Sequence, residues 1–116
     1  MYSLFLLADD SNGALPLLEV IDRAGFSCCV GADLSHLEEG GDPVAPEAVL
    51  VDLASVGTAQ THQFVDECKN LKLPVVVVIP SDQVSEHDPS LNADEFIFCP
   101  VKEQELVARV KQAIFR

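Results

Sequence analysis

The chain has 116 residues, of which 48% are hydrophobic, so we expect a single globular domain with its own core. Its formal net charge is −12, from 19 Asp and Glu against 7 Lys and Arg, which disfavours direct binding of this domain to nucleic acid. No apolar run approaches the roughly 20 residues of a membrane span, and the N-terminus lacks the basic start of a secretory signal. These features, with four cysteines that form no CxxC pair, predict a cytoplasmic protein with reduced thiols.

The first predicted elements are a strand, a helix and a weaker strand. Residues 4–8 form a continuous apolar run, as in strands buried on both faces of a sheet, and the acidic pair Asp9 and Asp10 follows it. Residues 13–25 carry apolar side chains at helical spacing, with N-cap residues before them and a glycine at their end. The weaker strand is predicted at residues 27–30.

The same alternation continues in the middle of the chain. Residues 38–47 form a loop because they are rich in Gly and Pro. The buried strand predicted at residues 48–51 then runs directly into Asp52. A helical pattern at residues 63–71 and another buried strand at residues 75–79 follow.

The C-terminal part contains one weak and two clear elements. Residues 82–92 form the weakest helix candidate, because Pro89 removes a backbone donor, and we expect this segment to be short or irregular. A strand at residues 95–98 and an amphipathic helix at residues 103–115 close the chain.

Strands that alternate with helices predict an α/β fold with a doubly wound parallel sheet. Such sheets bind ligands beyond the carboxyl ends of their strands, where the strand order reverses. In one known order of such sheets, 2-1-3-4-5, the first and third strands are neighbours at that point. Asp9, Asp10 and Asp52 are therefore expected to converge in one crevice.

Three crowded carboxylates repel one another unless a cation is bound or one acid takes up a proton. Short oxygen ligands suit Mg²⁺, and a carboxylate beside this ion can accept a phosphoryl group as a nucleophile. The alternative for Asp9 and Asp10 is a solvated turn whose charges favour the following helix N-terminus.

Four segments together resemble the response-regulator receiver domains, which are CheY-like and have a flavodoxin-like fold. The segments are "FLLADDS", "AVLVDLA", "KLPVVVVI" and "NADEFIFCPVKEQELVARV", and the resemblance covers essentially the whole chain. It implies that Asp9 and Asp10 bind Mg²⁺ and that Asp52 is the phosphorylated aspartate. It also implies that the backbone carbonyl of Ala54 is a further metal ligand.

The chain departs from the family at the positions that respond to phosphorylation. Cys99 replaces a lysine that contacts the phosphoryl group, and Ile79 replaces a switch threonine or serine, with Ser81 as the nearest hydroxyl after it. Phe96 stands at the aromatic switch position without a tyrosine hydroxyl. The family also leads us to expect a cis peptide bond before Pro100. The chain is therefore expected to be an atypical receiver.

The resemblance implies that residues 1–116 are the N-terminal regulatory domain of a longer protein and not an enzyme. Asp52 would receive its phosphoryl group from a histidine kinase or a phosphotransfer protein of a two-component phosphorelay. An attached or partner output module, for example one that regulates transcription, would respond. A second copy of the chain is a further candidate partner, whereas no membrane or nucleic-acid partner is expected.

Two other functions remain open. In a pseudo-receiver, contacts with a partner or a second copy do not depend on phosphorylation; Ile79 and Cys99 favour this reading, while the three aspartates favour phosphorylation. A flavodoxin-fold cofactor binder is weaker, because the acidic pair in "ADDSNG" repels a flavin phosphate.

Overall fold

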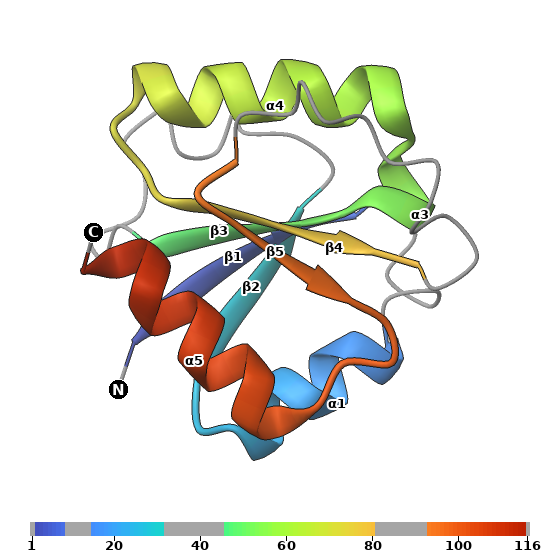
Figure 1. Cartoon of the computed structure of the whole chain (residues 1–116), viewed down its shortest axis with the longest axis vertical. Helices are drawn as coiled ribbons and strands as arrows, with labels where there is room; N and C mark the ends of the chain where they lie inside the picture. Colours follow the sequence, from blue (N-terminus) through green and yellow to red (C-terminus); the bar gives the residue numbers. More distant parts are fainter. Residues whose placement is uncertain (1, 9–14, 32–45, 81–92, 116) are drawn as a thin grey trace.

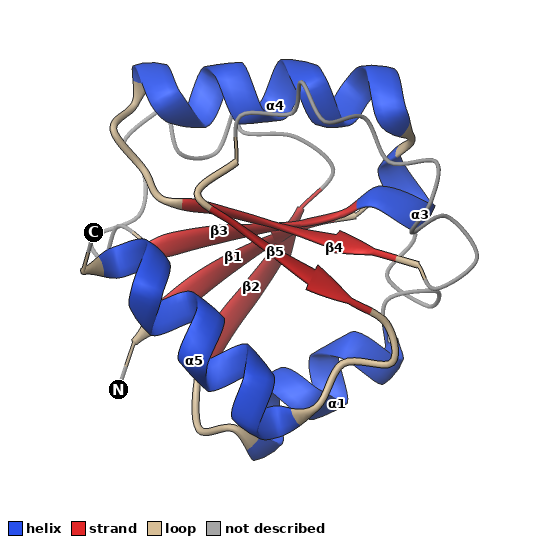
Figure 2. Ribbon diagram, viewed as in Figure 1, coloured by secondary structure: helices blue, strands red, loops and turns tan. Residues whose placement is uncertain are grey.

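The computed structural model describes residues 2–8, 15–31, 46–80 and 93–115, and Figure 1 shows its path. A sheet forms the middle layer, with α4 on one face and with α1 and α5 on the other (Figure 2). The elements are β1 (Ser3–Leu7), α1 (Leu15–Arg23), β2 (Ser27–Gly31), β3 (Ala48–Asp52), α3 (Leu53–Val56), α4 (Thr58–Asn70), β4 (Val75–Ile79), β5 (Glu95–Phe98) and α5 (Glu103–Ile114).

The sheet has five parallel strands in the order β2-β1-β3-β4-β5. The predicted fold class and strand order are therefore confirmed. The order reverses between β1 and β3, which pair from Leu4 with Ala48 to Leu7 with Val51. On the other side of β3, Asp52 pairs with Val78 of β4.

Both faces of the three central strands, β1, β3 and β4, are buried, which explains their unbroken apolar runs. Successive side chains of a strand point to opposite faces. In β1, Leu4 and Leu6 belong to the core beside α1 and α5, whereas Phe5 and Leu7 belong to the core beside α4. The core of the protein is thus divided into two layers by the sheet.

Helices α1 and α4 end with the same hydrogen-bond pattern, in which one residue adopts a left-handed conformation. After α1 this residue is Gly25, with φ of 88°, and the Phe26 N–H donates to the Ile21 carbonyl over 3.2 Å. After α4 it is Lys72, with φ of 59°, and the Leu73 N–H donates to the carbonyl five residues earlier over 2.9 Å. Glycine is the usual residue at this position because it has no Cβ.

Among the described residues, the element boundaries agree with the sequence expectations to within about two residues, except before β4. The strands at residues 75–79 and 95–98 are found where they were predicted. Helix α4 begins at Thr58, five residues before the predicted start, and α3 was not predicted at all. The first turn of α4 is polar, so no apolar periodicity marks it, and buried Thr61 is held by a 2.6 Å hydrogen bond to the Gly57 carbonyl.

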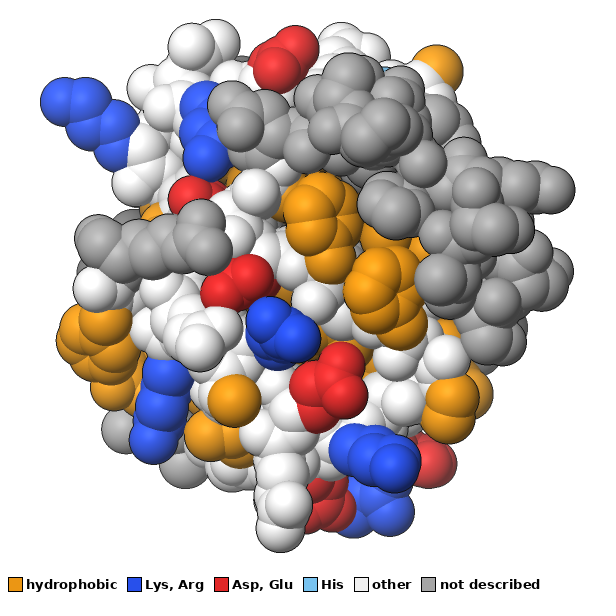
Figure 3. Space-filling model, in the orientation of Figure 1, with side chains coloured by type: hydrophobic (Ala, Val, Ile, Leu, Met, Phe, Trp, Pro, Cys, Tyr) orange, Lys and Arg blue, Asp and Glu red, His pale blue; other side chains and the backbone are white. Residues whose placement is uncertain are grey.

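The weak helix candidate at residues 82–92 lies outside the described residues, so its irregularity stays a prediction. Within the described ranges, no helix is long and apolar enough to cross a membrane. The face shown in Figure 3 mixes acidic, basic and apolar side chains and presents no continuous basic surface.

Candidate functional site

Asp52 is the last residue of β3 and lies at the carboxyl end of the sheet, beside the point where the strand order reverses. Its side chain follows the alternation of the strand and lies on the α1 and α5 face, together with Ala48 and Leu50. The residue is half-buried. The end of β3 therefore places a carboxylate where ligands of such sheets bind.

The surroundings of Asp52 disfavour its charged form. Burial raises the pKa of Asp52, and the backbone amides of Ala54 and Ser55 lower it only in part. No Lys or Arg in the described part of the chain pairs with this carboxylate. The charge at Asp52 thus lacks a described cationic partner.

Cys99 follows β5 and lies close to Asp52. Its backbone N–H donates to the Ile79 carbonyl over 2.9 Å, which extends the pairing of β4 and β5 by one residue. Burial raises the pKa of the Cys99 thiol, and the charge of Asp52 raises it further. The thiol is therefore neutral at pH 7, as expected for a cysteine beside an acid. The peptide bond between Cys99 and Pro100 is cis, as the family resemblance predicted.

A pocket of about 470 Å³ opens beside Asp52. Leu17 and Val20 of α1 form one wall, and Val78 and the residues after β5 form another. Sequence reasoning identified Asp52 but not this pocket, because Leu17 and Val20 have the helical spacing of ordinary core residues. Ala54 also lines the pocket, beside the carboxylate that it was expected to assist in metal binding.

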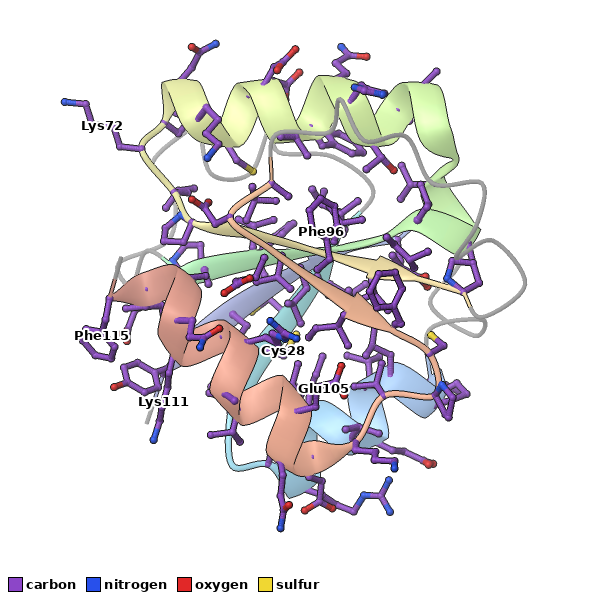
Figure 4. All side chains as sticks on the ribbon, viewed as in Figure 1. Cys28, Lys72, Phe96, Glu105, Lys111 and Phe115 are labelled. Atoms are coloured by element: carbon purple, nitrogen blue, oxygen red, sulfur yellow. The ribbon has the colours of Figure 1, made fainter. Side chains whose placement is uncertain are left out.

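The altered switch positions lie mainly on the other face of the sheet. Ile79 is fully buried, with 0% of its surface exposed, in the core layer beside α4. Phe96 packs against the same layer, and Figure 4 shows its ring between β5 and α4. No hydroxyl is available at position 79, and an apolar side chain fills that place. Ser81 lies outside the described residues.

The acidic pair Asp9 and Asp10 also lies outside the described residues, so its meeting with Asp52 stays a prediction. The chain is described as far as Ala8, whose N–H donates to the Gly31 carbonyl over 3.1 Å. The described residues alone contain no group of three potential metal-binding side chains. The adjacency of β1 and β3, which the site prediction requires, is confirmed.

The cysteines behave as expected for unpaired thiols. All four are free: Cys28 and Cys29 are adjacent on β2, Cys68 lies on α4, and Cys99 follows β5. Burial and the neighbouring Cys29 raise the pKa of Cys28 to about 11, while burial raises that of Cys68 to about 12. Neither residue is therefore ionised at neutral pH.

The sequence is similar over its full length to curated sensory transduction proteins. It is 30% identical over 124 residues to the sensory transduction protein RegX3 of Mycobacterium tuberculosis, covering 100% of this chain and 52% of that protein. RegX3 of Mycolicibacterium smegmatis is also 30% identical, over 128 residues, with the same coverage. The chain thus spans about half the length of the curated relatives it matches. No family model matches it.

Solved receiver domains share the fold. A response regulator receiver domain from Clostridium thermocellum superposes with a TM-score of 0.76 at 14% identity, covering 100% of this chain and 96% of that one. The receiver domain of a sensor histidine kinase from Pseudomonas aeruginosa, described with magnesium in its active site cleft, superposes with a TM-score of 0.73 at 13% identity, covering 99% and 98%. Fold and sequence together confirm the resemblance to the CheY-like response-regulator receiver domains, whose fold this chain shares.

Proposed function

We propose that the chain is an atypical receiver that accepts a phosphoryl group at Asp52 from a histidine kinase or a phosphotransfer protein. The observation that carries this proposal is the half-buried carboxylate at the end of β3, next to β1 and without a described cationic partner. A carboxylate held in this way is available both to a divalent cation and to an electrophilic phosphorus atom.

In the proposed reaction an oxygen of Asp52 attacks the phosphorus of a phosphohistidine. A P–O bond forms as the P–N bond breaks, and the imidazole leaves with its electron pair. Together with Asp9 and Asp10, which are expected to lie beside them, Asp52 and the carbonyl of Ala54 would form an all-oxygen donor set that suits Mg²⁺. When bound, this ion would neutralise charge on the phosphoryl oxygens.

The response to phosphorylation is proposed to be weak. At position 99 a neutral thiol stands beside Asp52 in place of a charged donor, and such a charge-assisted hydrogen bond contributes about 1.5–3 kcal/mol. That free energy corresponds to roughly ten- to a hundred-fold in a conformational equilibrium. Buried Ile79 adds no group that could follow the phosphoryl oxygens.

Incubation with acetyl phosphate and Mg²⁺, followed by intact mass spectrometry, tests the phosphoacceptor. Wild type should gain the mass of one phosphoryl group, and Asp52→Asn should gain none. Asp66→Asn, on the exposed side of α4, is the matched control and should behave as wild type. An unmodified wild type, or modification that persists in Asp52→Asn, would contradict the proposal.

A second candidate is a pseudo-receiver whose protein contacts do not depend on phosphorylation. Ile79 packed in the core and the neutral thiol of Cys99 favour this candidate. They stand in place of the hydroxyl and the lysine that would respond to a phosphoryl group. In this case Asp52→Asn would leave binding to a partner or to a second copy unchanged. Wild type that is never phosphorylated but binds its partner would favour this candidate.

We further propose that the domain is a non-enzymatic regulator in the cytoplasm and that it acts on an output module. The RegX3 relatives, described as sensory transduction proteins, are about twice as long as the matched region. A transcription-regulating module is the proposed output of a longer protein, with residues 1–116 as its regulatory part.

A further inference from the structure

The pocket beside Asp52 has the size and lining of a small-molecule site. Its volume of about 470 Å³ lies within the roughly 300–1,000 Å³ of typical ligand pockets. Most of its lining is apolar, from Leu17 and Val20 on α1 to Val78 on β4 and Val101 after β5. A ligand that fills it would therefore have an apolar body.

The charges around this pocket favour a cation. Asp52 and Glu19 contribute carboxylates to its lining, and Arg23 is the one basic residue among the described lining residues. The Nε of Arg23 lies 3.4 Å from Oε1 of Glu103, so this guanidinium already faces another acid. The remaining charge is negative, at the Asp52 end.

The short side chain of Cys99 keeps the pocket open next to this carboxylate. A thiol reaches only one atom beyond Cβ and carries no charge while protonated. It therefore neither fills the space beside Asp52 nor neutralises it. An ammonium group on a flexible alkyl chain could fill this space and neutralise the carboxylate of Asp52.

We propose that this pocket binds a small organic cation, with a primary ammonium group at Asp52 and an alkyl body between α1 and residues 99–101. The carboxylate supplies a charge-assisted hydrogen bond, and the apolar walls remove the alkyl group from water. The proposal requires neither Mg²⁺ nor phosphorylation, so it stands apart from the function proposed above.

Titration of the purified, unphosphorylated protein with n-pentylammonium in a chelator, followed by amide NMR, tests the site. Saturable shifts are expected at Val78, Cys99 and Val101. Each methylene buried is worth about fourfold in affinity, so n-propylammonium should bind about 15-fold more weakly. The neutral 1-pentanol lacks the ammonium group and should bind about ten- to a hundred-fold more weakly than n-pentylammonium.

Two variants locate the ligand. Asp52→Asn should weaken binding of n-pentylammonium about ten- to a hundred-fold, because the charge-assisted hydrogen bond is lost. Cys99→Lys should abolish binding, because the lysine occupies the pocket and carries its own ammonium group to Asp52. Cys29→Lys adds the same charge on the exposed side of β2 and is the matched control, which should bind as wild type.

Several results would overturn the proposal. These are equal affinities for n-pentylammonium and 1-pentanol, unchanged binding by a folded Asp52→Asn or Cys99→Lys variant, or the absence of saturable shifts. Thermal melting of each variant establishes that it is folded. Wild type that binds n-pentylammonium but gains no phosphoryl group would support this site and contradict only the proposed phosphorylation; the reverse result would contradict only this site.

Discussion

At the scale of single residues, the half-buried position of Asp52 disfavours the charged form of its carboxylate. Its pKa is raised by burial, so the folded protein holds this proton more tightly than the unfolded chain does. The free energy of unfolding contributed by this group is therefore highest when it is protonated, and it falls as the pH rises through its pKa. A neutral side chain of the same shape escapes this loss.

We expect Asp52→Asn to melt at a higher temperature than wild type at pH 7 in the presence of a chelator. The difference should shrink toward zero near pH 3, where both side chains are neutral. Thermal melts from pH 3 to pH 8 measure it, with Asp66→Asn as the exposed control. An Asp52→Asn variant that is less stable at every pH would show that the carboxylate has a structural role instead.

Asp94 has a structural role just before β5. Its Oδ2 accepts a hydrogen bond from the Val75 N–H over 2.8 Å, and its own N–H donates to the Val75 carbonyl over 2.9 Å. Its Oδ1 lies 3.1 Å from Nζ of Lys69. The side chain thus completes the pairing where β4 and β5 begin.

Asp94→Ala should lower the free energy of unfolding by about 1–3 kcal/mol, because the amide of buried Val75 loses its partner. Lys69→Met removes only the ion pair at the surface and should cost at most about 1 kcal/mol. Urea denaturation measures both. If the two variants lost the same free energy, the backbone hydrogen bond would not be the source of the effect.

At the scale of elements, the C-terminal ends of α1 and α4 share one hydrogen-bond pattern but place different residues at its left-handed position. Gly25 and Lys72 occupy the same left-handed position after α1 and α4. A side chain at this position costs about 1–2 kcal/mol through contact of Cβ with the backbone. Glycine avoids that cost, but it also raises the conformational entropy of the unfolded chain, which offsets part of the gain in stability.

Lys72→Gly should therefore stabilise the protein by about 0.5–1 kcal/mol, and Gly25→Ala should destabilise it by about 1 kcal/mol. Gln63→Gly, in the interior of α4, is the control and should destabilise by about 1 kcal/mol. Urea unfolding measures the three changes in free energy, from the shift of the midpoint when the slope of free energy against urea concentration is unchanged. Loss of stability in Lys72→Gly would mean that contacts of the lysine outweigh its backbone cost.

At the scale of the whole molecule, the sheet separates Asp52 from two of the altered switch positions, Ile79 and Phe96. Asp52 faces α1 and α5, whereas Ile79 and Phe96 belong to the layer beside α4. A signal from the proposed phosphorylation of Asp52 would therefore have to cross the sheet through groups that can change partners. An apolar side chain packed in the core offers no such exchange.

We expect a phosphoryl mimic with Mg²⁺ to shift amide resonances only around the carboxyl ends of the strands. Few changes should reach β5 or α5 away from residues 99–101. Comparison of NMR spectra with and without the mimic measures the extent. Large shifts along β5 and α5 would demonstrate an intact switch and contradict the prediction.

Mg²⁺ should stabilise the domain as a whole. With a dissociation constant on the order of 1 mM, about 10 mM Mg²⁺ adds about 1.4 kcal/mol by linkage. The melting midpoint should rise by roughly 4–10 °C, and by less in Asp52→Asn. Melts at matched ionic strength test this, and a midpoint indifferent to Mg²⁺ would exclude a cation site of that affinity.

The sequence by itself determined the strands, their parallel arrangement and the position of Asp52 at the end of β3. These features are local: a buried strand needs a continuous apolar run, and a polar residue after it marks its end. The family resemblance carried the strand order, which the structure confirms. The polar first turn of α4 gave no such periodic signal and was missed.

Only the tertiary structure decided which side chains meet. The pocket joins Leu17 to Val101 across most of the chain, and Asp94 binds an amide that lies 19 residues before it. It also decided that Ile79 turns away from Asp52, since the face on which a side chain lies depends on pairing with other strands. Such contacts form between segments that are distant in sequence, so no local pattern of residues encodes them.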